Sequence, residues 1–216
     1  GPAHFKIPDL NLWPQDTWAA QKDAKRINLD SIDKTSIEEW KEGDLLLLSG
    51  KLLTARDGAH KKIADLLKKG EPLPAGINFK NKFIYYVGPV NAVRNEVIGP
   101  AGPTTASRMD QFMEMMLDKL GVMGTIGKAE RSENAVQTIK KYQSVYLSAV
   151  GGAAYLVSKA ITSSKVVAFP ELGMEAIYEF EVKDMPVMVS IDTHGKSIYS
   201  EAPARWKNRA IPLTAA

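Results

Sequence analysis

The sequence predicts an α/β fold, and two observations support that prediction. Segments with apolar runs typical of strands alternate with segments whose apolar residues recur at helical spacing. Glycines and prolines mark many of the places where one kind of segment gives way to the other. An intermixed order of strands and helices is typical of α/β domains. No internal repeat or low-complexity tract interrupts this order.

The first 36 residues have weak periodicity and contain Trp13 and Trp18. We interpret residues 1–36 as an N-terminal arm or an interdomain connector, with the two tryptophans packed on another surface. Residues 37–203 form the predicted domain, and residues 204–216 form a peripheral tail. A terminal segment folded back on its own domain remains the alternative for the arm.

The first half of the domain is expected to hold two strands and two helices. The run "LLLLSGKLLTA" is a strand or a hairpin with its break at Ser49-Gly50. A helix follows, with Asp57 as its N-cap and Gly70 as its natural stop. The segment "KFIYYVGPV" is the next strand. A second helix spans Ser107 to Leu120, and its methionines lie on one apolar face.

The second half continues the alternation. A short strand and glycine turn, "VMGTIGKA", precedes the helix "ENAVQTIKKY". The segment "SVYLSAVGGAAYLVSKAI" passes from a strand through Gly151-Gly152 into a helix. The last strands lie in "KVVAFPELG" and "AIYEFEVKDMPVMVSIDTHG", where "DTHG" is a hairpin turn.

Composition excludes several classes of protein. The net charge of +3, with acidic and basic residues intermixed, is far from the imbalance of a nucleic-acid binder. The chain has no cysteine, so it forms no disulfide and supplies no thiolate to zinc or to an iron–sulfur cluster. No stretch has the length and apolarity of a membrane span, and the N-terminus lacks the features of a signal peptide. A cytoplasmic location is the simplest expectation.

The stretch "GPAGPTTASRMD" is the first candidate site. Backbone N–H groups at a helix start lack partners within the helix, and the helix dipole favours a negative charge there. Arg108 opposes that dipole, whereas a bound carboxylate or phosphate would reverse the penalty. Thr104 and Thr105 add two hydroxyls. An ordinary helix cap with a surface arginine explains the stretch equally well.

Two further cations lie at predicted strand ends. Arg56 precedes a helix, and Lys128 follows a strand and a glycine. Ligands of α/β proteins collect at such ends, so Arg56, Arg108 and Lys128 together favour an anion site. Each alone is more simply a paired or solvated side chain. Glu171 and Glu175 are acid–base candidates or partners for these cations, and His60 receives no role.

The ordered motifs then identify a family. The segments "ARDGAH", "YYVGP", "GPTTASRMD", "GKAER", "AVGGAAYLVSKAI", "PELGMEAIYEFEV" and "VSIDTHG" resemble the C-terminal domain of class I (iron–sulfur) fumarate hydratases. That domain is similar to the beta subunit of two-subunit fumarases and L-tartrate dehydratases. The resemblance covers about residues 30 to 200, and "WPQDTWAAQKDAKRINLD" resembles the connector of single-chain enzymes. We therefore expect an excised C-terminal domain. Gly1-Pro2 is then either the remnant of an expression tag or a native part of the chain.

The resemblance implies a swivelling β/β/α three-layer domain and the reversible hydration of fumarate to (S)-malate. It implies a 4Fe-4S cluster held by three cysteines of an N-terminal domain, so this chain alone is expected to be inactive. By the same resemblance Thr104 is the candidate catalytic base. The candidate substrate ligands are Arg56, Thr104, Thr105, Arg108 and Lys128.

Partners and alternatives follow from the same resemblance. The expected partners are fumarate or malate and the cluster-bearing domain, with no nucleic acid and no membrane. The family is typically dimeric, and the methionine-rich helix could serve an interface, although a core position is the simpler interpretation. The alternatives are a tartrate dehydratase beta-type domain, or a non-catalytic anion-binding or interaction domain that exposes Trp13 and Trp18.

Overall fold

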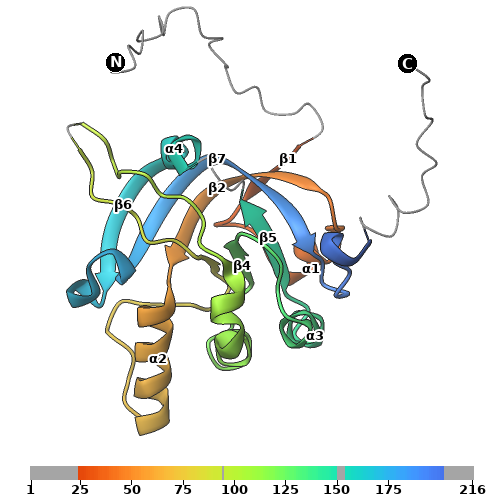
Figure 1. Cartoon of the computed structure of the whole chain (residues 1–216), viewed down its shortest axis with the longest axis horizontal. Coiled ribbons are helices and arrows are strands. Elements are labelled where there is room, and N and C mark those ends of the chain that lie inside the picture. The colour runs from red at the N-terminus through yellow and green to blue at the C-terminus, as the bar shows by residue number, and fades with distance from the viewer. Residues whose placement is uncertain (1–23, 94, 150–153, 202–216) are drawn as a thin grey trace, which may run out of the picture.

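The computed structural model describes residues 24–93, 95–149 and 154–201 (Figure 1). Trp13, Trp18, Gly151-Gly152 and the predicted tail 204–216 lie outside the described residues. In the described part of the chain, no helix combines the length and the apolarity needed to cross a bilayer.

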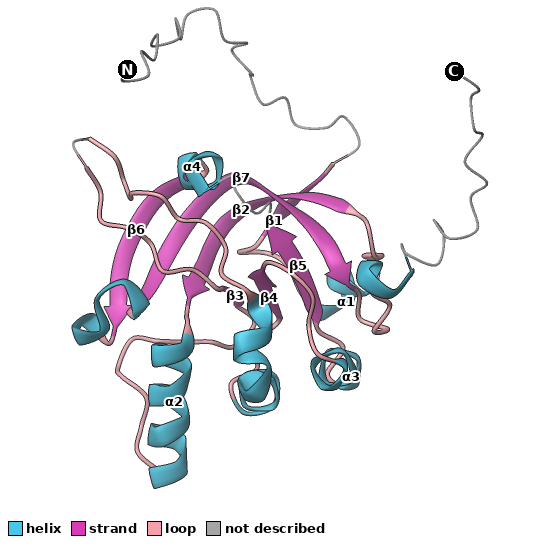
Figure 2. Ribbon diagram, in the orientation of Figure 1, coloured by secondary structure: helices cyan, strands magenta, loops and turns pink. Residues whose placement is uncertain are grey.

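Seven strands form one sheet in the order β1-β2-β3-β4-β5-β7-β6. The strands are β1 Lys25–Asn28, β2 Leu45–Thr54, β3 Phe83–Tyr85, β4 Gly124–Gly127, β5 Val145–Ala149, β6 Ile161–Ala168 and β7 Ile177–Ile191. Strands β1 to β5 pair in parallel, whereas β7 pairs antiparallel with both β5 and β2. These pairings close β2, β3, β4, β5 and β7 into a barrel-like ring (Figure 2). Outside the ring, β1 pairs with β2 and β6 pairs with β7.

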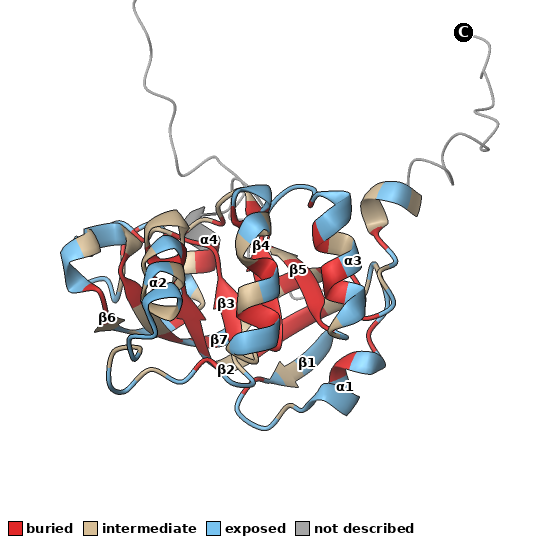
Figure 3. Cartoon of the chain, turned by 90° about the horizontal axis from the view of Figure 1, so that it is seen from below, coloured by how far each residue is buried: buried red, intermediate tan, exposed pale blue. Residues whose placement is uncertain are grey.

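The helical segments fill the connections between strands. They are α1 Lys34–Glu38, α2 Asp57–Lys69, the 3₁₀-helix η2 Ala106–Phe112, the π-helix η3 Met115–Lys119, α3 Glu133–Lys141, α4 Ala154–Lys159 and the 3₁₀ segment η4 Pro170–Glu175. Helices α2 and α3 and the η2–η3 helix lie against the same side of the sheet (Figure 3). The mixed architecture confirms the predicted α/β class. The swivelling three-layer arrangement stays a prediction.

Two hydrophobic clusters lie on opposite faces of the strands. Phe83, Tyr85 and Val87 belong to a cluster to which all five ring strands contribute, which places it inside the ring. Ile84 and Tyr86 belong to a second cluster shared with α2, η2, η3 and α3. The alternation follows from the two-residue period of a strand. Both faces of the parallel strands are thereby covered, which explains why their sequences read as continuous apolar runs.

Strand β2 is one bent strand, so the hairpin alternative for this segment is wrong. Its pairing with β7 shifts register between Leu48 and Gly50. Gly50 has φ +110, and a Cβ there would lie 2.8 Å from Asp30 Oδ2. A positive φ at a register shift is the local signature of a β-bulge, and glycine adopts it without strain.

One strand and one helix begin at residues other than those expected. Residues 25–28 of the predicted arm form β1 and pair with β2. Asp57 is the first residue of α2, and its N-cap is Arg56, which makes no side-chain capping bond. The predicted N-cap was therefore wrong by one residue: the backbone of Arg56 is extended, whereas Asp57 is already helical and its carboxylate pairs with Arg108.

The segment predicted as a regular helix over 107–120 is helical but changes its winding. It begins as the 3₁₀-helix η2 and ends as the π-helix η3. Met109, Met113 and Met116 are buried in the second cluster, which confirms the core interpretation of these methionines.

Candidate functional site

Parallel strands bring the predicted site residues to one edge of the ring. Arg56 lies two residues after the end of β2, and Lys128 follows the last residue of β4. Since β2, β3 and β4 are parallel neighbours, their carboxyl ends share an edge. The predicted convergence at strand ends is therefore present for these two cations.

The two threonines reach the same edge as an inserted extended segment. The N–H of Thr104 donates to the carbonyl of Tyr86 at 2.7 Å, and the N–H of Lys128 donates to the carbonyl of Thr104 at 3.1 Å. Thr105 and Lys128 form a parallel bridge. The threonine pair thus lies between the chain leaving β3 and the chain leaving β4.

Gly127 makes this insertion feasible. A Cβ at Gly127 would lie 3.0 Å from the Cβ of Ala106, 3.0 Å from the ring of Tyr86 and 3.3 Å from the carbonyl oxygen of Thr104. Contacts that short are tighter than ordinary packing allows. A residue without a side chain therefore keeps the threonine segment close to β4.

The hydroxyls of the threonine pair are not used to cap the helix. Thr105 is the N-cap of η2 but makes no side-chain capping bond. Within residues 24–93, 95–149 and 154–201, neither Thr104 Oγ1 nor Thr105 Oγ1 has a hydrogen-bond partner, and both residues are half-buried. Both hydroxyls therefore remain available to a ligand, which weakens the ordinary-cap explanation of the stretch.

Arg108 lies one turn further along η2 and forms a two-point ion pair with Asp57. Its Nε donates to Asp57 Oδ1 at 3.1 Å, and its Nη2 lies 2.9 Å from Oδ2. The side chain of Arg108 is 51% exposed. Exposed ion pairs contribute about 0.2–1 kcal/mol, so a second carboxylate can compete for this guanidinium at small cost.

Arg56 is more deeply buried than Arg108. Its side chain is only 17% exposed, and its Nη2 lies 3.4 Å from Glu175 Oε1. The other oxygen of Glu175 accepts a hydrogen bond from the N–H of Gly58 at 2.8 Å. Arg56 Nε is buried without a partner among the described residues. A Cβ at Gly88 would lie 2.6 Å from Arg56 Nη1, so any larger residue there would displace the guanidinium.

Lys128 differs from both arginines. Its side chain is exposed, and within the described part of the chain it makes no ion pair or hydrogen bond. Its backbone is fixed on both sides, because the carbonyl of Lys128 accepts from the N–H of Ala106 at 3.0 Å. The site therefore offers one unpaired cation beside two cations paired with carboxylates of the same chain.

Glu171 and Glu175 act as partners of cations. Glu171 pairs with Lys62, and Glu175 pairs with Arg56. The sequence left open whether these carboxylates were acid–base groups or partners of the three site cations. Glu175 pairs with one of those cations, whereas the partner of Glu171 is a lysine outside that set.

His60 is a structural residue. It is fully buried beside Tyr86 and Phe112, with ring centroids 5.6 Å and 5.4 Å away. Its Nδ1 lies 2.8 Å from the carbonyl of Arg56, so the ring donates there. Burial lowers the pKa of His60 to about 4, with a smaller lowering from the charge of Arg131. The ring is therefore neutral near pH 7.

Sequence reasoning missed Arg131, which has no exposed side-chain surface. It looks like one of the solvated charges of "GKAERSE", and only its packing against Tyr86 and Tyr146 distinguishes it. Among the described residues, no group of three or more His, Cys, Asp or Glu side chains is placed to hold a metal ion. The site on this chain is thus cationic and hydroxylic.

Comparison with known sequences identifies the family of the chain. A family model described as "Fumarase C-terminus" matches residues 1–202. The chain is 36% identical to fumarate hydratase 2 of Leishmania major over 94% of this chain and 35% of that protein. It is 34% identical to the aerobic class I fumarate hydratase of Escherichia coli K12 over 89% of this chain and 36% of that protein. The chain thus spans about a third of these hydratases.

A shorter relative is matched over most of its own length. The chain is 37% identical to the "putative L(+)-tartrate dehydratase subunit beta" of Methanocaldococcus jannaschii, over 80% of this chain and 90% of that protein. The family model and the relatives together show that the chain belongs to the family of fumarase C-terminal domains.

Proposed function

We propose that this chain is the substrate-binding part of a class I fumarate hydratase, which reversibly adds water to fumarate to form (S)-malate. The observation that supports this most is the arrangement of Lys128 beside Thr104–Thr105 at the strand ends where Arg56 also lies. Arg108 follows one turn later and pairs with the residue next to Arg56. A fumarate dianion matches a site with three cations, of which Lys128 has no side-chain partner among the described residues.

The proposed role of the cations is to bind and orient the two carboxylates. A guanidinium can bind a carboxylate through two parallel hydrogen bonds. Arg108 already makes one hydrogen bond and one further ion-pair contact with Asp57. In the dehydration direction, a proton leaves the carbon next to one carboxylate, and negative charge spreads onto that carboxylate. Fixed positive groups stabilise this developing charge more than the ground state.

Thr104 is the proposed proton acceptor in dehydration and donor in hydration, and Thr105 is a neighbouring substrate contact. The backbone carbonyl of Thr104 accepts a hydrogen bond from the N–H of Lys128, whose side chain is exposed. A neutral hydroxyl is a weak base, so this role needs activation by groups outside the described residues.

A 4Fe-4S cluster is the proposed cofactor of the complete enzyme. Such a cluster supplies a Lewis-acidic iron when it is bound. The chain has no cysteine, so we propose that three cysteines of a preceding domain hold the cluster. The chain alone is then expected to hydrate no fumarate. Turnover of fumarate by an iron-free preparation of this chain would contradict this expectation.

The test of the function is Arg108→Ala in the complete enzyme. Loss of a charged substrate contact is expected to lower kcat/KM for malate by about 100-fold. Arg26→Ala is the control, because Arg26 is also an exposed arginine in an ion pair, with Asp184. Equal kcat/KM values for Arg108→Ala and the unmodified enzyme would refute the assignment.

A tartrate dehydratase is the second candidate, supported by the match over most of the tartrate dehydratase beta subunit. Malate and L-tartrate differ by one hydroxyl group. Assays of the complete enzyme with fumarate, malate and L-tartrate decide between the candidates. A kcat/KM higher for L-tartrate than for malate would favour the second one.

Three narrower expectations accompany the proposal. The domain is expected to swivel against the cluster-bearing domain, the complete enzyme is expected to be a homodimer, and its location is expected to be the cytoplasm. Scattering, sedimentation and fractionation of the complete enzyme test them separately.

A further inference from the structure

A buried charged cluster lies directly behind the candidate site. The side chain of Arg131 has no exposed surface, and its Nε donates to Asp110 Oδ1 at 2.5 Å. Its Nη1 donates to Thr125 Oγ1 at 3.3 Å. Burying a charge is costly unless it is paired, so a cluster like this one is retained only where its neighbours need it or tolerate it.

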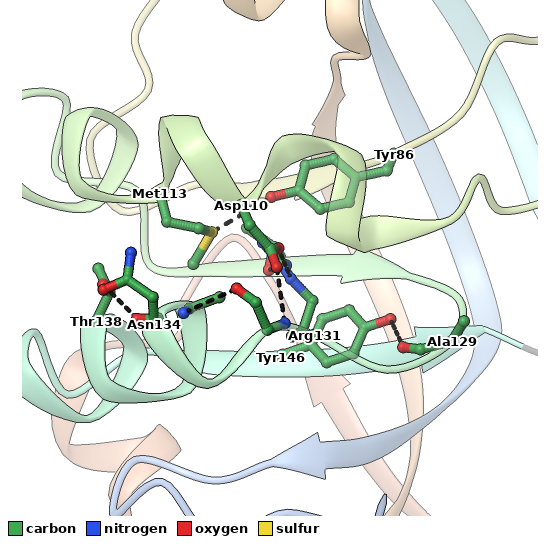
Figure 4. Close-up of polar contacts among 11 residues, drawn as sticks. Tyr86, Asp110, Met113, Ala129, Arg131, Asn134, Thr138 and Tyr146 are labelled. Atoms are coloured by element: carbon green, nitrogen blue, oxygen red, sulfur yellow. Dashed lines mark hydrogen bonds and ion pairs between the residues drawn. The ribbon is translucent and has the colours of Figure 1, made fainter.

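Two tyrosines hold the guanidinium on either side. The centre of the guanidinium lies 5.4 Å from the ring of Tyr86 and 5.1 Å from the ring of Tyr146 (Figure 4). The third nitrogen, Nη2, has no hydrogen-bond partner among the described residues. The electron-rich ring faces compensate part of its charge, since a planar guanidinium stacks well on aromatic rings.

The cluster joins the two segments that carry the candidate ligands. Asp110 belongs to η2, two residues after Arg108, and its Oδ2 accepts from the N–H of Ser132 at 2.8 Å. Arg131 and Ser132 belong to the loop that begins at Lys128. The Arg131–Asp110 pair therefore ties the helix of Arg108 to the loop of Lys128.

The loop is held a second time, next to Lys128. The hydroxyl of Tyr146 donates to the carbonyl of Ala129 at 2.8 Å. Ala129 has φ +65, which a residue with a Cβ adopts at a cost of about 1–2 kcal/mol. Burial raises the pKa of Tyr146, so its hydroxyl stays a donor throughout the physiological range. A strained residue maintained by a buried donor indicates that the backbone at Lys128 is held in one conformation.

We propose that Arg131, Asp110 and Tyr146 form a buried clamp that positions Lys128 relative to Arg108, so that the cations keep the spacing a dicarboxylate requires. The clamp residues are positioning residues and touch no substrate. This inference rests on the proposed function, because it acts through Lys128.

The test is a double-mutant cycle in the complete enzyme between Tyr146→Phe and Lys128→Met. Tyr146→Phe keeps the ring beside Arg131 and removes only the hydrogen bond to Ala129. It is expected to lower kcat/KM for malate by about fivefold, the value of one hydrogen bond. Lys128→Met alone is expected to lower kcat/KM by about 100-fold. Adding Tyr146→Phe to Lys128→Met is expected to cause no further loss.

Ser144→Ala is the matched control. Ser144 is buried, and its hydroxyl donates to the carbonyl of Met123 at 2.8 Å at the opposite end of β4 and β5. The Ser144→Ala variant loses the same kind of hydrogen bond without altering the clamp, so the kcat/KM of this variant for malate is expected to stay unchanged. Thr125→Val, which removes an acceptor of Arg131, is a second variant of the clamp and is expected to couple to Lys128→Met in the same way. Thermal unfolding of each variant identifies loss of fold.

Three results distinguish the possibilities. An equal loss from Tyr146→Phe in both backgrounds, or no loss in either, would overturn the clamp while leaving the Lys128→Met defect, and the proposed function, intact. An unchanged kcat/KM for Lys128→Met would overturn both the role of Lys128 and the clamp. Loss confined to the background with Lys128 supports the clamp, since only interacting residues give non-additive effects.

Discussion

Arg108 and Asp57 form a two-point ion pair that joins the first turns of two helices, η2 and α2. The pair lies next to Arg56 in the chain and one turn from Thr105. It gives Arg108 a carboxylate partner from the same chain. The same guanidinium is the proposed ligand of a substrate carboxylate, so Asp57 and the substrate compete for it.

Asp57→Asn is therefore expected to lower KM for malate. Breaking an exposed ion pair removes about 0.2–1 kcal/mol of competing interaction, which corresponds to a decrease in KM of about 1.4- to fivefold with kcat unchanged. Steady-state kinetics of the complete enzyme measure the effect. A KM raised tenfold would instead mean that Asp57 holds Arg108 in its binding position.

Gly88→Ala is expected to impair the site through Arg56. The new Cβ would lie 2.6 Å from Arg56 Nη1 and 3.3 Å from the carbonyl of Met174, so the guanidinium must move. Since catalysis depends on precise positioning, we expect kcat/KM to fall by about 100-fold.

Gly76→Ala is the control for that variant. Gly76 has φ +92 and open space around its Cα, so the substitution strains the backbone far from any cation of the site. It is expected to cost about 1 kcal/mol of unfolding free energy and no activity. Equal kcat/KM values for the two variants would contradict the role of Arg56.

The stability of the chain is expected to fall at mildly acidic pH because of His60. Burial lowers the pKa of His60 from 6.5 to about 4, with Arg131 adding to the lowering while Arg56 and Asp57 oppose it. Between these values the unfolded chain binds a proton that the folded chain excludes. The contribution is fully present above pH 6.5 and is lost as the pH falls towards 4, by about 3 kcal/mol in total.

Urea unfolding of the chain between pH 4 and pH 7 measures this dependence. His60→Phe is expected to remove the His60 part of the slope, whereas His194→Gln, which alters an exposed histidine, is expected to retain it. Identical slopes for the chain and for His60→Phe would show that carboxylates alone cause the loss.

Met113→Ala is expected to destabilise the domain by about 3 kcal/mol, because Met113 is buried in the cluster between the sheet and its helices. Met174→Ala, at an exposed methionine, is expected to have little effect. Urea unfolding gives the stability, and sedimentation velocity gives the association state. Unchanged stability with loss of a dimer would show that the methionine-rich helix serves an interface.

Local patterns predicted much of the fold. The apolar runs of β2, β3 and β5 and the helical spacing in α2 and α3 identify these elements, because burial imposes its period on the sequence. The closure of the ring was not predictable, since it depends on pairing between β2 and β7, which lie more than a hundred residues apart. Winding changes in the η2–η3 helix likewise come from packing, which overrides local preference.

The sequence by itself determined the family, the types of residue in the site and their positions after strands. It identified Arg56, Arg108 and Lys128 as candidates from charge at chain junctions. Only the tertiary structure decided that Asp57 pairs with Arg108 and Glu175 with Arg56, and that Lys128 has no side-chain partner among the described residues. The same holds for Arg131, which is buried although its neighbours Glu130 and Ser132 are exposed. Ion pairs and burial bring together residues that are distant in the chain. Such contacts impose no periodic pattern on the sequence, so the sequence does not predict them.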